Sequence, residues 1–253
     1  MPGAGRYTRT MKMKPLLAVA LLALGSSSLA LSQQGLPGDW EKKVSAVIPE
    51  AERARNVAEA GRKYDATRQA SLDAMKASAE DVKKAFFSQT SSVGDRQLSV
   101  GLLRDDRRKA SMAAVDALFR VRYFVSKKEW SQLWPEGYFA PAGLPPVMAG
   151  RVQKALPSVV TDPARLKQAE GVAATLTAAA KKDESARMKA TDKFWKLLEN
   201  YDSRRDEFID LVNTLEETQV KADNALVGSS GELQRILTPE EWTALMRQLT
   251  PAP

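Results

Sequence analysis

Histidine and cysteine, the side chains that most often act as metal ligands and nucleophiles, are both absent from this chain of 253 residues. Their absence excludes Ser-His-Asp and Cys-His catalysis, haem ligation through histidine and the usual zinc sites. Carboxylates remain, and three pairs are adjacent in the sequence: Asp105-Asp106, Asp183-Glu184 and Glu216-Glu217. Neighbouring side chains on a helix point about 100° apart. We therefore interpret these pairs as solvated helix faces, and we predict no catalytic, cofactor-binding or metal-binding residue.

A glutamate-tryptophan pair that follows a hydroxyl residue occurs twice. The chain reads VSKKEW at residues 125–130 and LTPEEW at residues 237–242. Both stretches fit a capping box, in which the hydroxyl accepts from a backbone N–H three residues on and the glutamate reaches back to the cap residue. The residues predicted to form the two boxes are Ser126, Glu129, Thr238 and Glu241.

Each predicted cap is preceded by an apolar residue and followed, four positions later, by a tryptophan. This is the arrangement of a hydrophobic staple, so we expect Trp130 and Trp242 to be largely buried. Aromatic side chains are also the first candidates for contact with a partner protein. In that role we consider Tyr138, Phe139, Trp130 and Trp242.

The stretch LTPEEW resembles the LTxxQ motif of the periplasmic Spy/CpxP-like helical stress chaperones. The resemblance covers about five residues, and Glu241 stands where that family has glutamine. It implies a small exported helical protein whose hairpins form a cradle-shaped dimer.

The remaining local signals are helical, because Ala, Lys, Glu, Arg, Leu and Gln dominate and strand-type alternation is missing. Residues 50–89 contain no proline and predict one long helix. Its apolar stripe is Leu72, Met75, Ala79, Val82 and Phe86. A second helix follows a break at residues 90–95 and runs to about Val125. Four prolines and two glycines within residues 135–146 predict a linker.

The same plan returns after the linker. We expect a short segment that ends at Pro157, a long helix after Asp162, and a further helix that GSSG at residues 228–231 interrupts. Val44-Ile48 and Phe86-Phe87 match residues 108 positions later, whereas Glu129-Trp130 matches Glu241-Trp242 after 112. These offsets predict a tandem duplication with a four-residue insertion at GSSG.

The predicted fold is all-α: a tandem duplication of a long antiparallel helical hairpin plus a short capped helix, packed like a bundle. Its parts are a signal peptide at 1–30, a first helical repeat at 31–134, the linker at 135–146 and a second helical repeat at 147–253.

The first 30 residues have the pattern of a secretory signal peptide. Four basic residues precede the apolar run LLAVALLAL at 16–24, and Ser28 and Ala30 fit a small-residue cleavage site. Removing those four from the 38 basic residues leaves 34 against 31 acidic ones. We therefore expect export to the periplasm or beyond, no membrane span after cleavage, and no nucleic-acid binding.

These observations favour an exported non-catalytic helical protein that binds other proteins, with a chaperone-like or envelope-stress role. The alternative is a structural or adaptor module that acts by self-association, for which a homodimer is possible. A third alternative, an enzyme, would need two carboxylates that converge across a cleft.

Overall fold

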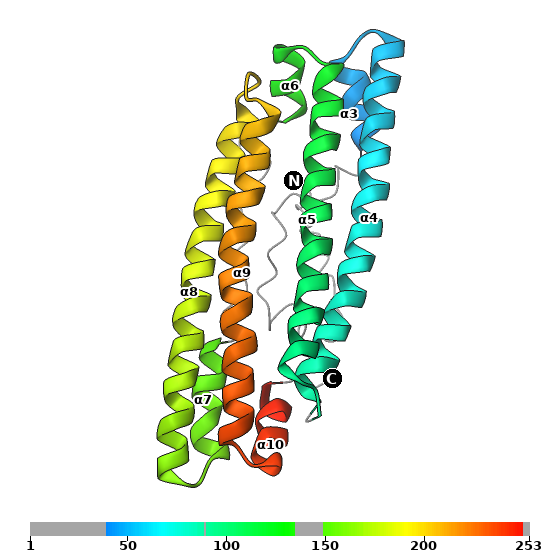
Figure 1. Cartoon of the computed structure of the whole chain (residues 1–253). Helices are drawn as coiled ribbons and strands as arrows, with labels where there is room; N and C mark the ends of the chain where they lie inside the picture. Colours follow the sequence, from blue (N-terminus) through cyan, green and yellow to red (C-terminus); the bar gives the residue numbers. More distant parts are fainter. Residues whose placement is uncertain (1–38, 89, 135–148, 250–253) are drawn as a thin grey trace, which may run out of the picture.

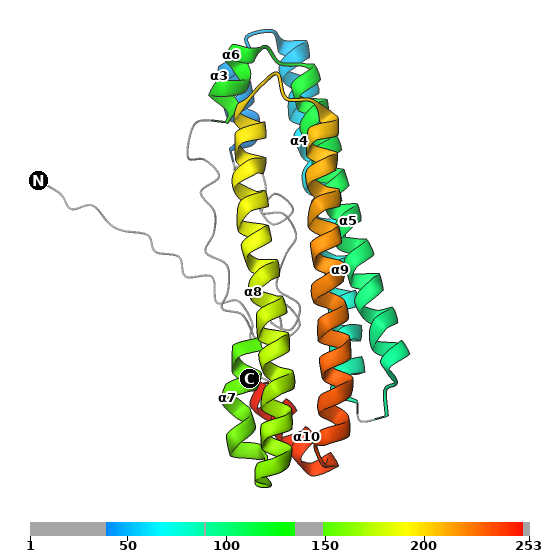
Figure 2. The ribbon, with the colours of Figure 1, turned by 60° about the vertical axis from the view of Figure 1, so that its left-hand side comes forward.

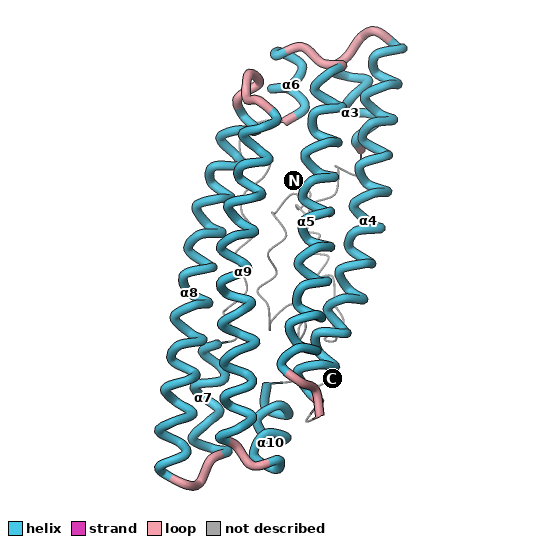
Figure 3. The backbone as a smooth tube through the Cα atoms, viewed as in Figure 1, coloured by secondary structure: helices cyan, strands magenta, loops and turns pink. Residues whose placement is uncertain are grey.

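The computed structural model describes residues 39–88, 90–134 and 149–249. These residues form eight helices and no strand, which confirms the all-α prediction (Figure 3). The helices are α3 (Trp40–Val47), α4 (Ala51–Phe87), α5 (Val93–Tyr123), α6 (Lys127–Leu133), α7 (Ala149–Val159), α8 (Pro163–Glu199), α9 (Arg205–Ile236) and α10 (Pro239–Leu249).

Two long antiparallel hairpins, α4–α5 and α8–α9, lie side by side and touch through α5 and α9 (Figures 1 and 2). The short helices α3 and α6 lie where α8 turns into α9, and we call this the α6 end of the bundle. The short helices α7 and α10 lie at the opposite end, where α4 turns into α5, and we call this the α10 end. The two hairpins therefore run in opposite senses.

Side-chain caps fix the starts of several helices. At α5 the hydroxyl of Ser92 accepts from the Asp95 N–H at 3.1 Å, and the Asp95 carboxylate accepts from the Ser92 N–H at 2.8 Å. At α8 the Asp162 carboxylate accepts from the Arg165 N–H at 2.7 Å. These contacts satisfy backbone donors that have no partner within the first turn of a helix.

The helices of the second half match those of the first at one constant distance along the chain. α4 and α8 each have 37 residues, and both of their ends are 112 residues apart. α5 and α9 begin 112 residues apart, at Val93 and Arg205. We call two residues that are 112 apart equivalent positions. The origin of the two halves by duplication stays a prediction.

The predicted offset of 108 and the four-residue insertion are wrong. The buried residue equivalent to Val44 is Leu156, and both have 0 % of their surface exposed. Phe86 is likewise equivalent to Leu198 rather than to Phe194. A shift of four residues is about one helical turn, so both alignments place apolar residues on the same face, and the sequence pattern alone could not separate them.

Two predicted helix ends are also wrong. α9 continues through GSSG to Ile236, and Ser229, Ser230 and Gly231 are buried. Glycine in a helix costs only about 1 kcal/mol, which packing against α5 outweighs. α7 continues two residues beyond Pro157 to Val159, because a proline in the last turn removes a single backbone hydrogen bond.

The core differs between the two ends. At the α6 end one apolar cluster includes residues of both hairpins, among them Val57 and Val115 of the first and Phe194 and Phe208 of the second. At the α10 end there are two separate clusters. One surrounds Trp242 within the second half.

The other cluster at the α10 end lies within the α4–α5 hairpin. Its buried members are Ala79, Val82, Phe86, Val100 and Leu103, and Val227 is the single buried residue that α9 adds. The two hairpins therefore share less apolar contact at this end than at the α6 end.

Candidate functional site

Both predicted capping boxes form. The Glu129 carboxylate accepts from the Ser126 N–H at 2.6 Å, and the Ser126 hydroxyl accepts from the Glu129 N–H at 3.3 Å. In the second copy the Glu241 carboxylate accepts from the Thr238 N–H at 2.9 Å, and the Thr238 hydroxyl accepts from the Glu241 N–H at 3.2 Å. These four residues start α6 and α10, and they have a structural role in this fold.

Each cap glutamate also binds an arginine that the sequence interpretation missed. Arg53 of α4 lies 2.5 Å from Glu129, and Arg165 of α8 lies 2.5 Å from Glu241. Burial raises the pKa of Glu129, but the hydrogen bonds from Ser126 and Arg53 outweigh it, so the net pKa is lowered. The two arginines occupy equivalent positions, and each ties a short helix to the start of its own hairpin.

Trp130 and Trp242 are each 2 % exposed, which confirms the burial that the staple predicts. They are therefore not available as surface contacts for a partner, and that part of the expectation is wrong. Leu133 and Leu245, on the same short helices, are fully buried beside them. The other two aromatic candidates, Tyr138 and Phe139, lie outside the described residues.

A charged group lies buried in the middle of the bundle, between α5, α8 and α9. Arg107 is 6 % exposed, Asp183 is 7 % exposed and Asp223 is 4 % exposed. Arg187 lies 2.9 Å from Asp183, and Arg104 lies 3.8 Å from Asp223. The expectation that Asp183 belongs to a solvated helix face is therefore wrong: its carboxylate faces arginines inside the bundle.

Burial sets the protonation of these two aspartates. Desolvation raises the pKa of Asp223 to about 6, although Arg107 and Arg104 oppose the rise. Desolvation also raises the pKa of Asp183 against the effect of Arg187 and Arg107. Paired acids with raised pKa values are a feature of acid–base catalysts, so the space beside them decides whether a substrate could enter.

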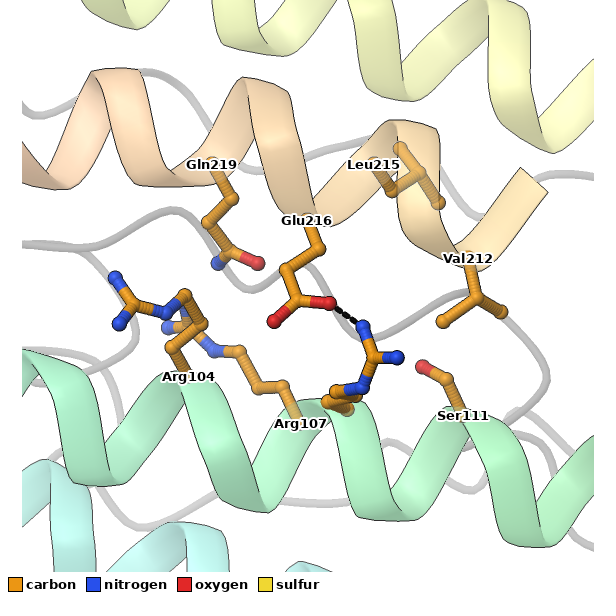
Figure 4. A pocket seen from close by; sticks show the side chains of 8 residues that line it. Arg104, Arg107, Ser111, Val212, Leu215, Glu216 and Gln219 are labelled. Carbon is orange, nitrogen blue, oxygen red and sulfur yellow. Dashed lines mark ion pairs between the residues drawn. The ribbon is translucent and has the colours of Figure 1, made fainter. Parts of the chain in front are cut away.

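One small pocket lies next to this charged group, beside Arg104 and Arg107. It lies between α5 and α9 and has a polar and apolar lining, in which Glu216 pairs with Arg108 (Figure 4). The lining residues are Arg104, Arg107, Arg108 and Ser111 of α5 and Val212, Leu215, Glu216 and Gln219 of α9. The pocket volume is about 20 Å³, room for about one water molecule, whereas pockets for small molecules usually exceed about 300 Å³. Asp183 and Asp223 do not line it. What the geometry shows is an ionic contact between the hairpins, from Arg104 of α5 to Asp223 of α9.

The surface of α5 offers a different kind of site. Large apolar side chains are exposed at five described positions: Val93, Leu98, Leu102, Tyr123 and Met188. Leu98 and Leu102 are 66 % and 50 % exposed and lie one turn apart on one face of α5. Gly94 and Gly101 share that face by helical spacing. We call these four residues the α5 face.

The second half of the chain provides an internal comparison for this face. The equivalents of Leu98 and Leu102 are Asp210 and Thr214, which are exposed at the corresponding positions of α9. The other three exposed apolar residues also have exposed polar equivalents, namely Arg205, Arg235 and Lys76. The hairpin architecture therefore does not require apolar residues at these positions. The presence of Leu98 and Leu102 on α5 needs another reason.

The two glycines of the α5 face support the same interpretation. A Cβ at Gly101 would come no closer than 3.9 Å to another side chain, and one at Gly94 no closer than 3.5 Å. Packing within the chain therefore does not require either glycine, although each weakens the helix by about 0.5–1 kcal/mol. Glycine beside leucine leaves a shallow, apolar helix surface that a second helix can approach closely.

No family model, curated protein or solved structure matches this chain. Among the described residues, no helix is long and apolar enough to cross a membrane, and no group of three acidic, histidine or cysteine side chains could hold a metal ion. The α5 face is thus the feature of the described structure that points most directly to a function.

Proposed function

We propose that this chain is an exported, non-catalytic helical protein that binds other proteins through the α5 face. The observation that carries the proposal is the exposure of Leu98 and Leu102 at positions where the second half has Asp210 and Thr214. Exposed apolar patches on otherwise charged surfaces mark sites of protein contact. A helix of the partner would lay apolar residues along α5 in the way amphipathic helices recognise grooves and faces.

The charge of the molecule supports a protein partner. Once the predicted signal peptide is removed, the basic residues exceed the acidic ones by only three, which offers little attraction to nucleic acid. The predicted export and the resemblance of LTPEEW to the LTxxQ group favour a chaperone-like role in the cell envelope. In such a role the α5 face would bind exposed apolar segments of unfolded clients.

The test replaces the α5 leucines by the residues of the equivalent positions, Leu98→Asp with Leu102→Thr. Because these side chains are exposed, the variant should keep the far-ultraviolet circular dichroism and melting temperature of the wild type. The readout is aggregation of reductively unfolded lysozyme, followed by light scattering with the protein at sub-stoichiometric amounts. We expect the wild type to suppress aggregation and the variant to lose most of that effect.

The matched control is Met188→Lys, which also replaces an exposed apolar residue by the one at its equivalent position, but on α8. This control should behave like the wild type. Equal suppression by the wild type and the double variant would contradict the proposal. A dimer that disappears in the double variant, without any effect on the client, would instead support the self-associating adaptor.

A further inference from the structure

The contacts between the two hairpins are strong at the α6 end. Phe208 packs edge-on against Phe119 of α5 with ring centroids 5.5 Å apart, inside the apolar cluster that both hairpins share. Hydrogen bonds also cross between the halves. Among them, the Trp130 indole N–H donates to the Leu198 carbonyl at 2.8 Å, and the Tyr201 hydroxyl donates to the Val125 carbonyl at 2.7 Å.

The α10 end differs at the positions of both phenylalanines and, within the part of the chain that the structure describes, lacks the indole hydrogen bond. The equivalent of Phe208 is Arg96, which is fully buried, and the equivalent of Phe119 is Gly231. The Arg96 guanidinium donates to the Gln234 side-chain oxygen at 2.6 Å and to the Ser230 hydroxyl at 3.3 Å. The Trp242 indole N–H, equivalent to the donor that reaches Leu198, has no hydrogen-bond acceptor among the described residues.

Arg96 also lies between the two apolar clusters of this end. Its guanidinium carbon is 5.7 Å from the Phe86 ring centre in the α4–α5 cluster and 5.6 Å from the Trp242 ring centre in the other. At this position the α10 end therefore has an arginine with polar and cation–π contacts, whereas the α6 end has Phe208 within a continuous aromatic core.

Separating the two hairpins should therefore cost less free energy at the α10 end than at the α6 end. Separation at the α6 end would expose aromatic core to water, which is unfavourable. Separation at the α10 end would return a buried guanidinium to water. The groups that Arg96 contacts across the helices are all neutral, so water replaces them at little cost.

We infer that the α10 end is a latch, in which the tip of the α4–α5 hairpin separates from α9 and α10 while the α6 end stays closed. Opening would expose the side of α5 that bears Arg96 and Val100, which by helical spacing lies opposite Leu98 and Leu102. This inference goes beyond the proposed function and does not depend on the α5 face. Opening of one segment while the rest stays folded is common in proteins.

The experiment is amide hydrogen exchange of the full chain, read by mass spectrometry of peptides. In the wild type, peptides covering 93–103 and 227–236 should exchange faster than the equivalent α6-end peptides covering 205–215 and 115–124. Gln234→Ala removes the shortest bond to Arg96 and should speed exchange at the α10 end about tenfold. Glu232→Ala, an exposed change on the same helix, is the control and should leave exchange unaltered.

A second variant acts in the opposite direction. Arg96→Phe introduces the residue of the equivalent position and should join the two apolar clusters, which slows exchange at the α10 end. Equal exchange at both ends of the wild type, or no change in Gln234→Ala, would overturn the latch.

The outcome separates this inference from the proposed function. If exchange is uniform but the α5 leucine variant loses client binding, the face binds without a latch. If the α10 end opens as expected but the leucine variant binds normally, the latch is real and the α5 face is not the client site.

Discussion

At the scale of residues, Asp223 links the protonation of one side chain to the folding of the chain. It lies on α9 at the contact between the hairpins, faces Arg104 and Arg107, and is 4 % exposed. Buried ion pairs of this kind add little net stability, because the loss of hydration offsets much of the attraction between the charges. They instead penalise any arrangement that leaves one charge unpaired.

The pKa of Asp223 gives a test of this placement. Folding raises it from 3.8 to about 6, so between these pH values the folded state binds more protons than the unfolded state. The contribution of Asp223 to stability therefore falls as pH rises through this window and is constant above it, with a total change of about 2–3 kcal/mol. Asp223→Asn should remove this slope.

The measurement is urea unfolding of the wild type and of Asp223→Asn at several pH values between 4 and 7. The difference between the two stabilities isolates Asp223 from the other acids. Asp210→Asn, at an exposed position of the same helix, is the control. A difference that does not vary with pH would show that Asp223 titrates alike in both states.

At the scale of elements, the helix starts could be predicted and the helix interiors only in part. The capping boxes of α6 and α10 depend on residues three apart, so a local pattern contains them. The prediction of a break at GSSG is wrong because intrinsic helix propensity describes an isolated helix and does not include packing against α5. In the folded chain Gly231 faces α5, where a Val93 methyl group occupies the space that a larger side chain would fill.

Two glycines of α9 allow this explanation to be tested. A Cβ at Gly231 would lie 3.1 Å from a Val93 methyl group, whereas a Cβ at the exposed Gly228 would have no neighbour within 4 Å. Gly228→Ala should therefore stabilise the protein by about 0.5–1 kcal/mol, because alanine favours the helix. In Gly231→Ala the crowding of Val93 should cancel part or all of that gain.

Thermal and urea unfolding of the two variants provide the comparison, with each serving as the other's control. If Gly231→Ala stabilises as much as Gly228→Ala, then α5 and α9 do not approach as closely as the structure indicates, and GSSG has no special role in the contact between the hairpins.

At the scale of the whole molecule, the sequence predicted two similar halves but not how they pair. Two helical hairpins can pack side by side with their tips together or opposed, and both arrangements bury the same apolar stripes. The contacts that decide for the opposed arrangement are non-local: Trp130 reaches Leu198, and Arg96 reaches Gln234. Neither pair shares a pattern that a single sequence reveals. The α5 face also became evident only once burial had identified the exposed leucines.

Trp130 and Trp242 are equivalent residues, but the opposed arrangement of the hairpins gives them different surroundings. Both are 2 % exposed, and each lies under an arginine of α5, Arg122 at 5.9 Å and Arg96 at 5.6 Å from the ring centres. They differ in one interaction, since Trp130 donates its indole N–H to the Leu198 carbonyl of the other half, whereas the Trp242 N–H has no acceptor among the described residues.

Replacing each tryptophan by phenylalanine should therefore give unequal losses of stability. Both changes remove similar ring volume and retain the contact with the arginine, but only Trp130→Phe leaves a carbonyl without its donor. We expect Trp130→Phe to cost about 1 kcal/mol more than Trp242→Phe, measured by urea unfolding followed through circular dichroism. Equal losses, or a larger loss for Trp242→Phe, would mean that the hydrogen bond between the halves does not hold the α6 end closed, and the difference between the two ends would then rest on the aromatic core alone.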